Sequence, residues 1–303
     1  MRGNEKRFLT YMCFQSIPGR AALTGAVVLL SACSSVQNTA PGYEANADSG
    51  PSKFSGPMIA IPPGNFVMGD DRSSQPDERP AHRVHVDAFL LSAYEVTLGQ
   101  FRLFLAATGY QNHLPCWGWE GQRLAFQEEW SWLDPGFPQS DNHPVACISW
   151  QDAQAYVQWI NIQLKPKKPF RLPSEAEWEY AVRVGRYDRF PWGDEVDGTK
   201  LNCWSCRDPY EYTSPVGSFA ANPYGLFDMS GNQWEWVEDC YSDNYNNAPA
   251  VAAVTRAPEC RSHVLRGGSW ADNDNFLRAA YRVPYQNGYR QQSFGFRLAQ
   301  DAP

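Results

Sequence analysis

Helix-start signals occur at only three places in this 303-residue chain, and this scarcity limits the folds open to it. Each signal is a capping box, in which a Ser or Thr is followed three residues later by an acid or amide that bonds back to the backbone. The boxes begin at Thr97, Ser149 and Ser174. The apolar runs behind the first two end near Gly109 and Pro166, so the chain is expected to form short helices separated by long irregular stretches.

The rest of the chain is rich in residues that build turns and pack loops. It holds 12 Trp, 23 Gly and 23 Pro, whereas only 19% of its residues are charged. Helical bundles have the opposite bias, toward Ala, Leu, Glu and Lys. Alternation at residues 83–89 and 295–299 predicts short strands. The sequence therefore predicts one α+β domain over residues 57–303, with little regular secondary structure.

Residues 1–33 are typical of an export signal. Basic residues near the start precede a short apolar run at residues 21–30, which is well under the ~20 residues that span a bilayer. The run ends in Leu-Ser-Ala-Cys, which resembles the bacterial lipobox and makes Cys33 the predicted lipidation site. An ordinary secretory signal is the alternative. With Ser34 next, the likeness to Gram-negative lipoproteins favours an outer-membrane anchor facing the periplasm.

Residues 34–56 consist largely of Ser, Asn, Ala, Pro and Gly and are predicted to be a flexible linker. Without residues 1–33 the chain keeps 22 basic and 32 acidic residues. A chain with this charge is a poor partner for nucleic acid.

An exported chain is expected to oxidise its cysteines. Outside the signal segment six remain, namely Cys116, Cys147, Cys203, Cys206, Cys240 and Cys260. Six cysteines allow 15 pairings. On proximity in the sequence we predict Cys116–Cys147, Cys203–Cys206 and Cys240–Cys260. The C-x-x-C spacing of the second pair also fits a redox motif or half of a zinc site, but no second ligand pair accompanies it.

Ordered blocks along the chain carry a family resemblance. They include residues 61–69 (IPPGNFVMG), 171–181 (RLPSEAEWEYA), 222–229 (NPYGLFDM), 231–236 (GNQWEW) and 265–270 (LRGGSW). Together they resemble the formylglycine-generating enzyme, or sulfatase-modifying factor, family. The resemblance implies a single domain of the complex C-type-lectin-like kind, α+β with low regular secondary structure.

The same resemblance implies two structural calcium sites. Calcium takes six to eight oxygen ligands from carboxylates, amides and carbonyls. The matching residues are Asn202, Cys203, Asp208 and Tyr210 at the first site, and Asp228, Gly231, Gln233 and Glu235 at the second. Turn capping or pairing with arginine is the alternative role for these acids.

Members of this family that make formylglycine hold copper on two thiolates, which are soft ligands suited to Cu(I). Aligned on Gly267 and Gly268, those cysteines fall on Asp272 and Leu277. The sequence therefore predicts no copper and no formylglycine-generating oxidase. The cleft itself is expected to remain, with Ser269 and Trp234 at groove-lining positions and with Asp272 and Asp274 as candidate acids or bases.

Three functions compete for this cleft. The first is a peptide- or protein-binding accessory or signalling factor of the envelope, as in bacterial relatives that partner type VI secretion kinases. Its groove residues would be Arg278, Tyr281, Arg282, Tyr289 and Arg290, although any of them could belong to an internal salt-bridge network. The second is a divergent oxidase or tailoring enzyme of the pyoverdine-maturation type. The third is residual formylglycine formation by another oxidant.

Overall fold

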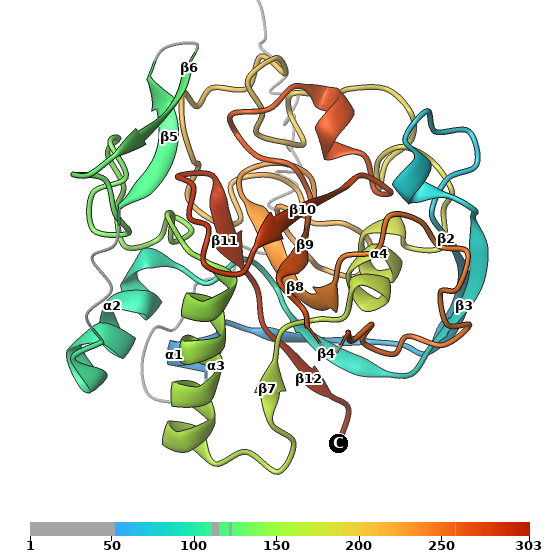
Figure 1. The fold of residues 1–303 in the computed structure, drawn as a ribbon, viewed down its shortest axis with the longest axis horizontal. Helices are drawn as coiled ribbons and strands as arrows, with labels where there is room; N and C mark the ends of the chain where they lie inside the picture. The colour runs from blue at the N-terminus through green and yellow to red at the C-terminus, as the bar shows by residue number, and fades with distance from the viewer. Residues whose placement is uncertain (1–51, 111–114, 121–122, 258) are drawn as a thin grey trace, which may run out of the picture. The chain divides into compact units, whose positions relative to one another are not determined.

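The computed structural model describes residues 52–110, 115–120, 123–257 and 259–303, which belong to one compact unit, Asn46–Pro303 (Figure 1). The predicted signal peptide, the lipidation site at Cys33 and most of the predicted linker lie outside the described residues. Within these ranges no helix has both the length and the apolar character needed to cross a membrane.

The three predicted helices are confirmed. They are α2 (Leu98–Thr108), α3 (Trp150–Leu164) and α4 (Glu175–Arg183), and each begins with a capping box in which both reciprocal hydrogen bonds are present. Helix α2 ends at Gly109, whose φ of 62° is in the left-handed region. Three shorter helical segments, α1 (Ser52–Ser55), η1 (Pro76–Glu78) and η2 (Asp274–Leu277), were not predicted.

Helix α1 lies at the end of the segment that was predicted to be a linker. The Phe54 ring packs edge-on against Trp159 of α3 at 5.2 Å between centroids. The Phe54 carbonyl also accepts a hydrogen bond from the Tyr156 hydroxyl at 2.6 Å. These contacts hold the segment on the core, so the ordered domain begins before residue 57.

Two four-stranded sheets form the centre of the domain (Figure 1). The first has the order β1-β4-β12-β7, from Met58–Ile61, Phe89–Ser92, Ala299–Asp301 and Phe170–Arg171. The second has the order β10-β9-β8-β11, from Arg282–Gln286, Ser262–Arg266, Trp234–Cys240 and Phe294–Phe296, with only β11 and β8 parallel. Two hairpins complete the strands, β2–β3 (Gly64–Met68, His82–Val86) and β5–β6 (Cys116–Glu120, Arg123–Gln127).

Both stretches that were predicted as single strands are divided. Residues 83–89 belong to β3 and β4, and residues 295–299 belong to β11 and β12. Between β11 and β12 lies Arg297, which is fully buried and pairs with Glu235. The chain passes from one sheet to the other at this arginine, and alternation alone does not reveal such a transfer.

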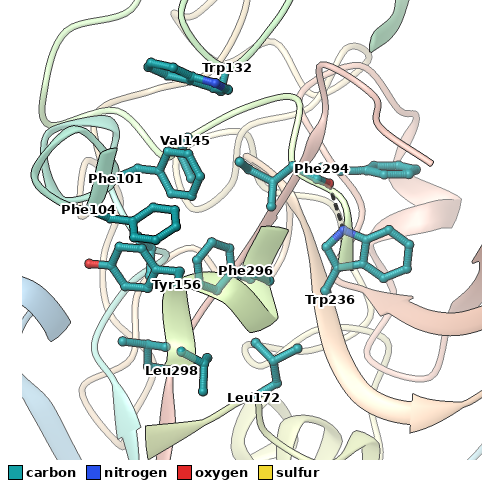
Figure 2. Close-up of a cluster of buried hydrophobic side chains, with 14 of the residues drawn as sticks. Phe101, Phe104, Trp132, Val145, Tyr156, Leu172, Trp236, Phe294, Phe296 and Leu298 are labelled. Carbon is teal, nitrogen blue, oxygen red and sulfur yellow. Dashed lines mark hydrogen bonds between the residues drawn. The ribbon is translucent and has the colours of Figure 1, made fainter. Parts of the chain in front are cut away.

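Aromatic rings from the helices and from the second sheet share one core (Figure 2). Tyr156 of α3 contacts Phe101 and Phe104 of α2 and Phe296 of β11. The Trp236 indole donates a hydrogen bond to the Ile148 carbonyl at 2.9 Å, so its polar atom is satisfied inside the core. Trp234 and Trp236 of β8 both belong to this core.

All three predicted disulfides are present. They join Cys116 to Cys147, Cys203 to Cys206 and Cys240 to Cys260. The last one links the end of β8 to the segment just before β9 and closes the long connection between these strands. Every cysteine of the described ranges is therefore oxidised.

Candidate functional site

The turn that follows β9 contains two glycines, and the second of them lies against a buried leucine. Gly267 and Gly268 have φ values of 97° and 71°, a region that favours glycine. A Cβ atom on Gly268 would lie 2.6 Å from Leu277 Cδ1. Leu277 is fully buried in a cluster with Phe190 and Leu201. Its role is to pack under the turn, and it does not face a ligand.

Asp272 is held by two donors from different parts of the chain. Its Oδ2 atom accepts hydrogen bonds from Ser269 Oγ at 2.5 Å and from Trp234 Nε1 at 2.8 Å. Trp234, the first residue of β8, is itself buried. The structure thus brings together three of the four predicted candidates, Asp272, Ser269 and Trp234, in one rigid unit.

Burial sets the acidity of this carboxyl. Desolvation raises the pKa of Asp272 to about 6, and the hydrogen bonds from Ser269 and Trp234 oppose that rise. A carboxyl with this pKa changes its protonation state close to neutral pH. It can therefore accept or release a proton under mild conditions.

This titration predicts a signal on the neighbouring indole. The Trp234 Nε1–H resonance should shift with pH, with a midpoint of about 6, because its acceptor loses charge on protonation. Two-dimensional nitrogen NMR of the indole groups measures this shift, and Trp234→Phe identifies the resonance. Trp236, which donates to a carbonyl, is the internal control and should not follow the same curve. The Asp272→Asn variant should lose the titration; if the variant retains it, Asp272 is not the titrating group.

Half-buried rings extend from Asp272 across one side of the second sheet. We call Tyr281, Tyr285, Tyr289 and Trp117 the aromatic row. Tyr281 lies 6.1 Å from the Trp234 ring, Tyr285 lies 4.8 Å from Tyr289, and Tyr289 stacks on Trp117 at 5.9 Å. Burial raises the pKa values of Tyr281 and Tyr285, and the nearby Asp272 carboxylate adds to both shifts. The row therefore begins beside the carboxyl and ends at β5.

Two predicted groove residues are corrected by the structure. Arg282 is buried and forms two hydrogen bonds to the Glu175 carboxylate, at 2.6 and 2.8 Å. Arg290 is buried and pairs in the same way with Asp152, at 2.7 and 2.9 Å. A buried guanidinium needs a partner to offset its desolvation, so both arginines are ion-pair partners within the domain and not free groove residues.

Arg278 and Asp274 lie on the other side of Tyr281. Arg278 binds both oxygens of the buried Glu78, at 2.8 and 2.6 Å, and Asp274 pairs with Arg189 at 3.2 Å. Arg278, Arg189 and Tyr281 line a cavity of about 690 Å³. Asp274 is thus committed to an ion pair and does not join the Asp272 unit.

The residues predicted for the first calcium site lie close together. Asp208 accepts hydrogen bonds from the backbone N–H groups of Cys203 and Tyr210, each at 3.0 Å. Asn202 is buried and donates through Nδ2 to the Tyr212 carbonyl at 2.9 Å. No residue of the described ranges donates to its Oδ1 atom, which leaves one buried oxygen available to a cation.

At the second predicted site the two acids, Asp228 and Glu235, differ in their hydrogen-bond partners. Asp228 is buried, and desolvation raises its pKa to about 6. Its Oδ2 accepts from Gly217 N at 2.7 Å, while its Oδ1 has no donor among the described residues. Glu235 is bound by Arg297 through both oxygens, at 2.6 and 2.7 Å, and by Trp178 Nε1 at 2.8 Å. Glu235 is thus an ion-pair partner of Arg297, and its role as a calcium ligand stays a prediction.

Glu95 is a third acid in this cluster and was not predicted. It is fully buried, and neither carboxylate oxygen has a hydrogen-bond partner among the residues that the structure describes. Burial raises its pKa well above the ordinary value, and the charges of Asp228 and Glu235 raise it further. Three acids therefore gather around the single guanidinium of Arg297, which we call the buried acid cluster.

Comparison with known proteins now assigns the fold. Residues 45–302 match the profile of the sulfatase-modifying factor enzyme 1-like domain. The chain belongs to the sulfatase-modifying factor family. It is 33% identical over 298 residues to the formylglycine-generating enzyme of Thermomonospora curvata, an alignment that covers 83% of this chain and 95% of that enzyme. It is 32% identical to the Bos taurus enzyme, covering 80% and 74%.

Other similar proteins extend the comparison. The serine/threonine-protein kinase pkn1 of Chlamydia caviae is 34% identical over 80% of this chain, but only 37% of that kinase is covered. Among solved structures, PvdO from Pseudomonas aeruginosa superposes with a TM-score of 0.72 at 33% identity, covering 81% of this chain and 94% of PvdO. CarF, at 22% identity and a TM-score of 0.58, shares the fold. The α+β architecture of short helices, strands and loops is that of this family.

Sequence reasoning missed residues whose importance depends on distant partners. Nothing near Glu95 or Arg297 in the sequence shows that these two residues meet in the interior. Tyr285 and Trp117 were likewise missed as members of the aromatic row. The alternation around β10 was the available signal for Tyr285, since it places residues 281, 283 and 285 on one face.

Proposed function

We propose that this protein is a peptide-binding accessory factor of the cell envelope and does not act as a copper-dependent oxidase. One observation carries the proposal. All cysteines of the described ranges are in disulfides, and the carboxyl of Asp272 occupies the turn beside Gly268. Cu(I) prefers soft thiolate ligands, and a carboxylate is a hard ligand. The local donors therefore suit hydrogen bonding better than copper chemistry.

The aromatic row supplies the binding surface in this proposal. Tyr and Trp side chains offer large contact areas at low entropic cost and dominate many recognition sites. Ser269 Oγ and Trp234 Nε1 both donate to Oδ2 of Asp272. In this proposal a peptide hydroxyl, amide or ammonium group bonds to the other oxygen, Oδ1. A peptide lying along the row would place one polar group at Asp272 and apolar side chains against Tyr285 and Tyr289.

Binding to an immobilised peptide library tests the proposal. Asp272→Asn and Tyr289→Ala are each expected to weaken binding of the selected peptides by about tenfold or more, the effect of losing one contact of about 1.4 kcal/mol. Asp87→Asn is the matched control, because this side chain is 97% exposed and belongs to β3–β4. Equal binding by all three variants would remove the aromatic row from the proposal.

Incubation with a cysteine-containing sulfatase peptide, copper and oxygen tests the competing activity. The protein with intact disulfides should leave the cysteine unchanged by mass spectrometry. An aldehyde product would show that formylglycine formation persists and would overturn the assignment.

A tailoring enzyme is the second candidate, and the raised pKa of Asp272 favours it. A carboxyl that titrates at about pH 6 is suited to general acid or base catalysis. In that case a small-molecule product should accumulate in the wild-type strain but not in an Asp272→Asn strain, whereas a pure binding factor would leave the product profile unchanged.

We also propose that the domain binds calcium as a structural ion. Asn202 Oδ1 and Asp228 Oδ1 are buried oxygens without donors among the described residues, which fits a hard cation. The bound ion would supply rigidity rather than chemistry.

Calcium is therefore expected to raise the melting temperature. At a free concentration of about 100 times Kd the gain is about 2.7 kcal/mol, or roughly 5–10 °C for a domain of this size. Differential scanning fluorimetry in EDTA and in excess calcium measures the change. Asp228→Asn and Asn202→Ala should each reduce it, while magnesium should give a smaller shift because it demands a tighter octahedral site. Identical melting curves in EDTA and calcium would argue against any bound ion.

Finally, we propose that Cys33 is lipidated and anchors the domain on the periplasmic side of the outer membrane. The three disulfides support export, since such bonds persist in oxidising compartments. Metabolic labelling with a fatty acid should mark the wild type but not a Cys33→Ala variant. Equal labelling of both would contradict the anchor.

A further inference from the structure

A histidine faces the disulfide at the end of β8. Cys240 of β8 is in register with His263 of β9, and Cys260 lies just before β9. The two sulfur atoms and a ring nitrogen of His263 lie within 4.8 Å of one another. Within the described ranges, this is the only group of three or more His, Cys, Asp or Glu side chains close enough to hold a metal ion.

The hydrogen bonds around His263 fix its tautomer. Asn287 Nδ2 donates to the Cys260 carbonyl at 2.8 Å, which identifies Oδ1 as the acceptor on the other side of the amide. His263 Nδ1 lies 2.7 Å from that Oδ1 and must therefore carry the proton. The lone pair on Nε2 is left facing Cys260 Sγ at 3.3 Å. A disulfide sulfur has no proton to give, so in the oxidised protein this lone pair has no donor among the residues that the structure describes.

Packing holds the ring in this orientation. His263 is buried and stacks on Trp150 with 3.8 Å between ring centroids and a 12° angle between planes. Burial lowers the pKa of His263, so the ring is neutral near pH 7. A neutral imidazole held by a carbonyl oxygen on its other nitrogen is the usual arrangement of a metal-binding histidine.

The sulfur pair is accessible from one side. Cys240 lines a cavity of about 400 Å³, together with Asp239, Thr255 and Arg256. Cys260 is itself partly exposed. A dithiol can reach the bond, and a water molecule can occupy a fourth coordination position.

We propose that Cys240, Cys260 and His263 form a Zn²⁺ site when the disulfide is reduced. A dithiol reductant transfers two electrons and two protons, giving two protein thiols and the oxidised reductant. Zn²⁺ then displaces both thiol protons and binds two thiolates and His263 Nε2, with water as the fourth ligand. This function is separate from peptide binding at Asp272 and does not depend on it.

The geometry fits this ion with little movement. Tetrahedral zinc with ordinary bond lengths places a thiolate sulfur and an imidazole nitrogen about 3.6 Å apart and two sulfurs about 3.8 Å apart. Cys260 Sγ and His263 Nε2 already lie 3.3 Å apart. The two sulfur atoms must separate, by rotation of their own side chains, and the three ligand atoms already lie within 4.8 Å of one another.

Metal titration of the reduced, folded protein tests the proposal. The wild type should bind one Zn²⁺ more than the Cys240→Ser/Cys260→Ser variant, which keeps the other four described cysteines. Competition with a chromogenic chelator measures the stoichiometry. Substitution by Co²⁺ should add thiolate-to-metal charge-transfer absorption in the wild type alone. The oxidised wild type should bind no ion at this site.

Two further variants separate this site from adventitious thiol binding. Asn287→Ala removes the group that orients His263 and should weaken zinc binding about 10–100-fold. His263→Ala leaves both cysteines in place and should abolish the tight site. Equal stoichiometry in the wild type and the double serine variant would overturn the proposal. So would equal affinities of the wild type, Asn287→Ala and His263→Ala, since thiols of an unfolded chain would bind zinc without regard to these residues.

Discussion

Replacing Arg297 with methionine is expected to lower the free energy of unfolding by about 3–5 kcal/mol, the usual cost of leaving a buried charge without its partner. Arg297 and Glu235 are both fully buried and share two hydrogen bonds. The guanidinium also donates to the Phe227 carbonyl at 2.9 Å. Its loss leaves the acid cluster with no countercharge, so Glu95 and Asp228 add to the penalty. Urea denaturation at pH 7 measures the change.

The exposed pair Arg102–Asp141 provides the matched control. Its side chains are 44% and 67% exposed, so Arg102→Met should cost no more than about 1 kcal/mol. Adding Glu235→Gln to Arg297→Met should recover part of the lost stability, because it removes a buried charge. If Arg297→Met is no more costly than Arg102→Met, the buried pair does not support the fold.

The elements that the sequence predicted well are those set by neighbouring residues. A capping box needs a Ser or Thr and a side chain three residues later, so the starts of α2, α3 and α4 were readable. The short spacing of Cys203 and Cys206 likewise limited their pairing. The ends of strands were less readable, since Arg297 interrupts an alternating run only because Glu235 lies beside it in the folded protein.

The candidate site was predictable in part for the same reason. Asp272 and Ser269 are close in sequence, and family-like blocks pointed to Trp234. Whether a charged side chain is buried or exposed was not predictable, because burial depends on the whole fold. Arg282 and Arg290 looked like surface residues in a polar loop, but each meets an acid from a helix start more than 100 residues earlier, at Glu175 and Asp152.

The Gly231→Ala variant is expected to be destabilised by about 2–5 kcal/mol, because it combines backbone strain of about 1–2 kcal/mol with overpacking of about 1–3 kcal/mol. Gly231 has a φ of 93°, and its added Cβ would lie 2.1 Å from the carbonyl oxygen of Asn202. That oxygen accepts a hydrogen bond from Asn232 N at 3.1 Å, so it cannot move without breaking the bridge between residues 202 and 231. The two predicted calcium sites meet at this bridge, and the variant should also lose most of the calcium-dependent rise in melting temperature.

Gly109→Ala measures the backbone part of this effect alone, so the difference between the two variants gives the packing part. Gly109 has a φ of 62°, but a Cβ there would meet no atom of the described residues within 4 Å beyond its own helix and chain neighbours, so the backbone cost of about 1–2 kcal/mol is expected to dominate. Its calcium response should match that of the wild type, because Gly109 ends α2 and belongs to neither predicted site. Thermal denaturation of both variants with and without calcium makes the comparison. Equal losses of stability together with equal calcium responses would mean that the contact between Gly231 and Asn202 does not join the two sites.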